Sequence, residues 1–258
     1  MLLCADGFNP GSTLMIHGYG RESARACVTT TLSAAAGGVS GLFIKKYFPA
    51  KLGGTAIWDI AHTCNSLLGG LVGITAGCSV VTPNHAILIG VISALVYHGA
   101  SCMMRKLKID DPLDAYAVHG ACGYWGCLAV GLFAHVQYSY APAEGHALRV
   151  GDGGVDLGPD AGLFMPGTRG MLFVTQLVVP LIEIVWVCTL SAIMFSVLKL
   201  CKIFRVSADE ETAGMDVSKH GGTAVRRPPV PPEPTLFALR GATATRQAES
   251  VRSLLTPP

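Results

Sequence analysis

Five long apolar stretches dominate the sequence and limit the kind of structure that it can form. A bilayer core about 30 Å thick needs roughly 20 mostly apolar residues per helix, and each stretch is close to that length. Half of the 258 residues are hydrophobic and only 14% are charged, against about 25% in soluble domains. The chain is therefore predicted to be an all-α, multi-pass integral membrane protein with helices at about residues 27–48, 61–82, 86–104, 115–135 and 171–200.

The second and fourth stretches are rich in glycine, as in "NSLLGGLVGITAGC" at residues 65–78. Glycine weakens an isolated helix in water, but in a membrane it lets helix backbones approach closely. These two helices are therefore expected in the interior of the bundle.

Basic residues between the stretches predict the orientation of the chain in the membrane. The runs "KKYFPAK", "RKLK" and "KLCKIFR" follow the first, third and fifth stretches, so alternation puts all three on one side. The connections on the other side are "TPNH" and a long loop, residues 136–167, in which Arg149 is the only Lys or Arg. The positive-inside rule makes the basic side, and hence the C-terminus, cytoplasmic.

The composition changes near residue 206, where a polar, proline-rich segment begins. Such a segment buries too little apolar surface to form a core. We therefore expect a membrane domain at residues 1–205 and a mostly disordered cytoplasmic tail at residues 206–258. The motif "RRPPVPPEP" leaves open a polyproline II segment that binds a partner.

Several function classes lack support in the sequence. It contains no phosphate-binding or dinucleotide-binding loop, no nucleophile elbow and no basic nucleic-acid footprint. Nine cysteines are scattered without a CxxC pair, which favours buried free thiols over disulfides or a metal site. We expect neither an enzyme nor a nucleic-acid partner, and no cofactor or metal.

His119 is the main candidate for a functional residue. It lies inside the fourth stretch among small residues, in "AVHGACG". Ionisable side chains at membrane depth are costly unless they are paired or serve a pathway, and a neutral imidazole has one donor and one acceptor. Two readings stay open from the residues alone: His119 binds a small polar molecule, or it bonds a neighbouring backbone carbonyl.

Three carboxylates, Asp110, Asp111 and Asp114, precede that helix. Carboxylates in a first turn accept the free N–H groups and complement the helix dipole, and Pro112 suits the first helical position. The basic run at residues 105–108 also allows a charge network with these acids.

Other ionisable side chains lie in or near the stretches. Glu183 sits well inside the fifth, so it needs a partner or a polar cavity, either as a structural contact or in transport. His62, His85 and His98 lie near the ends of stretches, where we expect them to be interfacial or structural.

Four ordered motifs resemble one family. "DDPLDAYAVHGACGYWGCLAVGLFA", which begins at Asp110, looks like the tenth membrane helix of the ammonium transporter family (Amt/Mep/Rh). "GFNPGS" at residues 7–12, "NSLLGGLVGITAGC" at 65–78 and "GMDVSKHG" at 214–221 match further family motifs in order. The resemblance covers residues 5–222.

The resemblance implies roles for individual residues. His119 would be the second of two pore histidines, Phe8 part of the aromatic gate of the outer pore, and Ser12 a hydroxyl at the external recruitment site for ammonium. Ala115 would occupy a pore-lining position. Asp110 and Asp111 would match the acidic pair below the pore.

The resemblance also implies a partner and an assembly. The function would be transmembrane transport of ammonium or ammonia by a homotrimer in the plasma membrane. Residues 214–221 would belong to a cytoplasmic segment that meets a regulatory protein.

The family fold has eleven helices, and this sequence resembles its C-terminal half, about five of them. The first pore histidine would belong to the other half, so the chain is expected to supply one wall of a pore, as a fragment or with a separate first half. The alternative is a non-transporting membrane sensor or interaction protein that keeps the half-fold and the tail.

Overall fold

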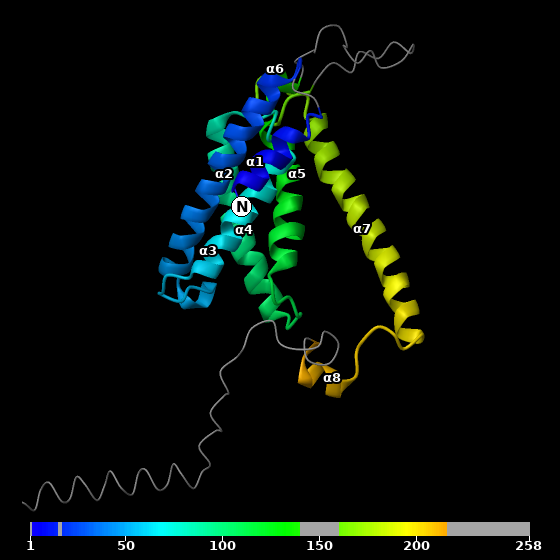
Figure 1. Cartoon of the computed structure of the whole chain (residues 1–258). Helices are drawn as coiled ribbons and strands as arrows, with labels where there is room; N and C mark the ends of the chain where they lie inside the picture. The colour runs from blue at the N-terminus through cyan, green and yellow to red at the C-terminus, as the bar shows by residue number, and fades with distance from the viewer. Residues whose placement is uncertain (1, 15–16, 140–159, 216–258) are drawn as a thin grey trace, which may run out of the picture. The chain divides into compact units, whose positions relative to one another are not determined.

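The computed structural model describes residues 2–14, 17–139 and 160–215, and all regular elements in these ranges are helices (Figure 1). The chain divides into two compact units, Met1–Thr189 and Leu190–Pro258. The first unit holds the elements that surround His119, and the second holds the end of the last long helix and a short helix after it.

Helices α2, α3, α4 and α5 pack against one another in the first unit (Figure 1). The short helix α1 packs on α2, where the Asn9 amide donates a buried hydrogen bond of 3.0 Å to the Thr30 hydroxyl. The elements are α1 (Leu2–Gly11), α2 (Gly20–Tyr47), η1 (Ala50–Leu52), α3 (Ile60–Thr75), α4 (Pro83–Lys106), η2 (Tyr116–Ala121), α5 (Cys122–Phe133), α6 (Val136–Ser139), α7 (Met171–Leu200) and α8 (Ala208–Ala213).

Helix α7 has the bounds expected of the fifth span, residues 171–200, whereas the other described helices differ in length from the expected spans. Three described helices, α2, α4 and α7, are long and apolar enough to cross a membrane. With 28 residues, α2 is about 42 Å long and begins seven residues before the expected Cys27, because its first turns, "GRESARA", are polar and extend beyond a 30 Å apolar core.

The other two expected spans are shorter than predicted. Helix α3 has 16 residues, about 24 Å, and ends at Thr75 instead of Thr82 because the next residues form the tight turn into α4, with the Gly77 N–H donating to the Ile74 carbonyl. The fourth span is divided between η2 and α5, which together run from Tyr116 to Phe133.

Glycines let three helices meet at Ser33. The Ser33 hydroxyl of α2 donates to the Gly70 carbonyl of α3 at 2.8 Å. A Cβ at Gly70 would lie 2.6 Å from the Ser33 carbonyl oxygen, and a Cβ at Gly90 of α4 would overlap the same oxygen. Because α3 packs on α2, α4 and α5, its glycines lie in the interior of the bundle, as expected.

Residues 160–170, the described residues just before α7, contact the end of α5. The Gly162 N–H donates to the Ala134 carbonyl at 2.8 Å, which holds the segment against α5. The Asp160 carboxylate then accepts the N–H groups of Arg169 (2.5 Å) and Leu172 (2.8 Å). Asp160 therefore caps the beginning of α7.

The second unit contains the short helix α8 near the start of the predicted tail, residues 206–258. Ser207 and Glu210 form a capping box at the start of α8. Arg205 pairs with Glu211 across 2.6 Å. The part of the tail beyond residue 215 lies outside the described residues.

Candidate functional site

His119 lies in a π-helical turn, η2, at the start of the fourth span. Asp111 precedes this turn in the sequence. Its two carboxylate oxygens accept the N–H groups of Ala115 (2.8 Å) and Tyr116 (2.9 Å). Single π turns inside α-helices are frequent at functional sites, because they change the direction in which a side chain points.

The aspartates before this turn have different surroundings. The Asp111 carboxylate accepts backbone N–H groups, which is the capping role that we expected for at least one of the three aspartates. Neither Asp110 nor Asp111 forms an ion pair within the described residues. Pro112 lies in the turn between Asp111 and Asp114, where the Asp114 N–H donates to the Asp111 carbonyl, and so it precedes the first helical residue instead of occupying it.

The His119 side chain is exposed and lines a cleft of about 630 Å³ in the first unit. One wall comes from η2 and α5 and the other from α7. Glu183 of α7 lines the same cleft, so the His119 and Glu183 side chains share one space. Apolar and small residues form most of the remaining lining, among them Tyr116, Gly123, Cys127 and Ile184.

The other residues that the resemblance singles out do not line this cleft. Phe8 lies in α1 with its ring 70% exposed. The Ser12 hydroxyl, just after α1, donates to the Phe8 carbonyl at 2.8 Å. Ala115 is exposed at the start of the fourth span and does not line the cleft. Its neighbour Tyr116 does.

A hydrogen-bond network that the sequence analysis missed ties Asp114 to α4. The Asp114 carboxylate accepts from the Tyr97 hydroxyl (2.7 Å) and the Ser101 hydroxyl (2.9 Å), and Arg105 donates to Ser101 at 2.8 Å. Tyr97, Ser101 and Arg105 recur every four residues, so they form a polar stripe along one face of α4. That spacing is the signal that could have revealed the network.

Of the two roles expected for His62 and His98, interfacial or structural, their burial excludes the interfacial one. His62 is 5% exposed and His98 is 4% exposed, and their ring centroids lie 5.1 Å apart. His98 Nε2 bonds the Leu52 carbonyl at 2.7 Å, whereas His62 Nε2 and His98 Nδ1 have no partner among the described residues. In those ranges no group of three His, Cys, Asp or Glu side chains is placed to hold a metal ion.

Comparison with known proteins identifies the family. The family model described as Ammonium Transporter Family matches residues 6–225, most of the chain. The chain belongs to the ammonium transporter family. It is accordingly a membrane protein, as its apolar helices indicate.

Relatives agree with this assignment. Ammonium transporter 1 member 1 of Solanum lycopersicum is 38% identical over 233 residues, which cover 84% of this chain and 43% of the relative. The crystal structure of Candida albicans Mep2 is similar with a TM-score of 0.59 and 26% identity, over 73% of this chain and 38% of that one.

A third similar structure is named Sensor Amt Protein. Its TM-score is 0.64 at 29% identity, over 83% of this chain and 45% of that one. The chain thus spans less than half the length of each of these relatives.

Proposed function

We propose that this chain takes part in transport of ammonium or ammonia across a membrane and that His119 lines the pathway. The observation that carries the proposal is the cleft, where a π turn presents an exposed imidazole to a largely apolar space. Membership of the ammonium transporter family supplies the substrate class.

The physical chemistry of the cleft suits this substrate. Ammonium loses its hydration in an apolar space at a cost of several kcal/mol or more, whereas neutral ammonia loses far less. An imidazole can donate to ammonia or accept a proton or hydrogen bond from ammonium. His119 would therefore contact the substrate where it is least hydrated, and Glu183 in the same cleft could offset a positive charge.

Residues at α1 would act before the cleft. The exposed ring of Phe8 can attract a cation by about 0.5–2 kcal/mol through its π face. Because the Ser12 hydroxyl donates its proton to the Phe8 carbonyl, its oxygen keeps lone pairs that can accept an N–H of ammonium. We propose that Phe8 and Ser12 recruit ammonium, while Ala115 borders the pathway.

We propose that the chain forms the C-terminal half of an eleven-helix fold, and that the other half completes the pathway around this cleft, to which this chain contributes η2, α5 and α7. The proposed assembly is a homotrimer in the plasma membrane.

The orientation rests on charge. Lys45 and Lys46 end α2, and Arg105 and Lys106 end α4, on the side that we propose to be cytoplasmic together with the C-terminus. The proposed regulatory segment, residues 214–221, lies mostly outside the described residues.

The sensor alternative has one observation in its favour, the likeness to Sensor Amt Protein. The curated relatives are named ammonium transporters, which favours transport.

The test is growth on limiting ammonium in a cell without its own ammonium transporters. The cell expresses the 258-residue chain, or a chimera in which residues 6–225 replace the matching segment of the Solanum lycopersicum relative. The chimera should restore growth, and His119→Ala should abolish it. The matched control is His17→Ala, at an exposed histidine that does not line the cleft. A chimera that is present in the membrane but gives no growth, or equal growth with His119→Ala, would refute the proposal.

A further inference from the structure

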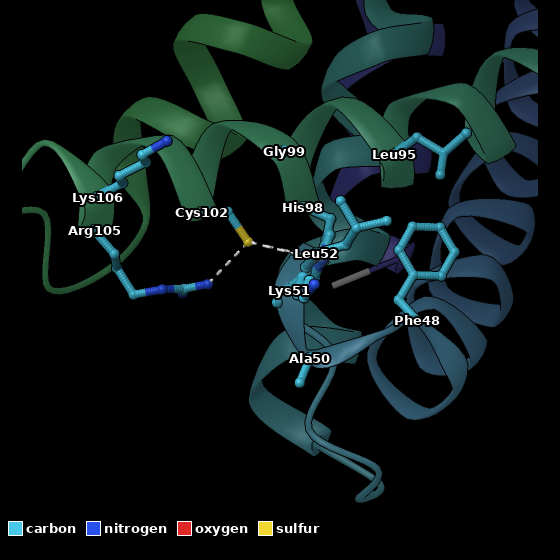
Figure 2. A pocket seen from close by; sticks show the side chains of 11 residues that line it. Phe48, Ala50, Lys51, Leu52, Leu95, His98, Gly99, Cys102, Arg105 and Lys106 are labelled. Carbon is cyan, nitrogen blue, oxygen red and sulfur yellow. Dashed lines mark hydrogen bonds between the residues drawn. The ribbon is translucent and has the colours of Figure 1, made fainter.

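A second pocket, of about 490 Å³, lies between the end of α4 and the residues that follow α2 (Figure 2). Figure 2 shows α4 on one side and the segment from Phe48 to Leu52 on the other. Phe48, Leu52 and Leu95 give it apolar walls, and Leu52 and Leu95 are 59% and 44% exposed. None of the residues that line this pocket lines the cleft at His119.

Three cations line this pocket, and none of them forms an ion pair with a carboxylate of the described residues. Lys51, Arg105 and Lys106 are all exposed, and none of the described residues that line the pocket is a carboxylate. Arg105 donates to the Ser101 hydroxyl at 2.8 Å and to the Cys102 sulfur at 3.3 Å, so its direct partners are neutral groups, and the Asp114 carboxylate is linked to it only through Ser101.

Aromatic side chains indicate the depth of the pocket in the membrane. Phe43, Tyr47 and Trp58 form an exposed cluster next to it in sequence, with ring centroids 6.0–6.1 Å apart. Lys46 lies 5.1 Å from the Trp58 ring centroid. Amphipathic aromatic rings and lysines gather at the level of lipid headgroups, so the pocket opens at that level.

We propose that the pocket binds an anionic phospholipid, with the phosphate at the three cations and the first part of an acyl chain along Phe48, Leu52 and Leu95. Charge complementarity selects this occupant, because an anionic headgroup has a net negative charge that three positive side chains attract, whereas a zwitterionic headgroup has none. The end of the α4 dipole is worth only about half a negative charge, so the cations outweigh it. The inference stands apart from the proposed transport.

The test is a lipid titration of the full 258-residue chain in detergent, followed by native mass spectrometry. Phosphatidylserine should bind more tightly than phosphatidylcholine. Combining Lys51→Gln, Arg105→Gln and Lys106→Gln should weaken phosphatidylserine binding by about a hundredfold, because each basic residue near an anionic lipid contributes about a factor of five. Phosphatidylcholine binding should change little.

A matched control removes the same charge elsewhere, with Lys199→Gln, Lys202→Gln and Arg205→Gln near the end of α7. It should leave the tightest phosphatidylserine site intact. An equal loss in the control, or equal affinity for the two lipids in the unsubstituted chain, would overturn the proposal. Displacement of phosphatidylserine by millimolar inorganic phosphate would assign the pocket to a free anion and overturn it as well.

A second measurement needs no substitution in the pocket. Cys102 lines it and is partly exposed, whereas Cys64 is exposed and lies outside it. Phosphatidylserine should slow modification of Cys102 by a thiol reagent severalfold and leave Cys64 unchanged, and phosphatidylcholine should protect neither. No protection of Cys102 by phosphatidylserine would contradict the assignment.

Discussion

Gly90→Ala should destabilise the protein, although alanine is the better helix former. Gly90 is buried in α4, and an added methyl would overlap the carbonyl oxygen of Ser33 in α2. That oxygen belongs to the backbone, so relief requires α2 and α4 to move apart. Overpacking of this kind costs about 1–3 kcal/mol, while the gain in helix propensity is about 0.5–1 kcal/mol. The net loss should be about 1–2 kcal/mol.

The control substitution lies in the same helix. Gly99 is exposed and has no neighbouring atom within 4 Å of an added Cβ, so Gly99→Ala should stabilise by the propensity gain alone. Thermal unfolding in detergent measures both. At about 2–4 °C per kcal/mol, Gly90→Ala should lower Tm by about 2–8 °C and Gly99→Ala should raise it slightly. If both variants raise Tm equally, close contact of α2 and α4 at Ser33 is not what positions these helices.

Two more predictions concern polar contacts. Tyr97→Phe removes one hydrogen bond to Asp114 and should lower the free energy of unfolding, measured with denaturant, by about 1 kcal/mol. Tyr124→Phe should change it little. Equal effects of the two substitutions would show that the hydrogen bond to Asp114 does not stabilise the fold. At Asp160, burial raises the carboxyl pKa, but backbone N–H donors, including those of Arg169 and Leu172, outweigh this and hold the pKa below the ordinary value of 3.8. A depressed pKa means that Asp160 stabilises the start of α7 fully above the ordinary value and stops doing so as the pH falls through the lower, folded-state value. In the unsubstituted chain, the hydrogen-exchange rate of the Leu172 amide, corrected for the intrinsic rate, should rise as the pH falls through this value. In Asp160→Asn the corrected rate should already be higher at neutral pH and should show no such rise in acid.

The sequence predicted the helical membrane architecture because bilayer thickness fixes the length of an apolar stretch. The sequence predicted the first and last residues of the helices less accurately. Helix α2 starts at Gly20 because polar residues can form helix outside the apolar core, and α3 stops at Thr75 because a turn consumes residues that are as apolar as the helix itself. Composition cannot distinguish a helix from a turn there.

For the candidate site, "AVHGACG" predicted His119 but not its surroundings. Asp111 accepts the N–H groups at the start of the π turn, and the sequence alone does not indicate which of three nearby aspartates does so. The cleft joins His119 to Glu183, 64 positions later, a pairing that no local spacing encodes. Burial of His62 and His98 likewise follows from how α3 and α4 pack, not from their places near helix ends.

The most direct test of the central claim measures whether substrate reaches position 119. The His119→Cys substitution is made in the chimera with the Solanum lycopersicum relative, and the rate of modification of the introduced thiol by a small reagent is measured with and without ammonium. The same measurement on His17→Cys is the control. If His119 lines the pathway, ammonium slows modification at position 119 and not at position 17. Equal rates with and without ammonium at position 119 would contradict the claim.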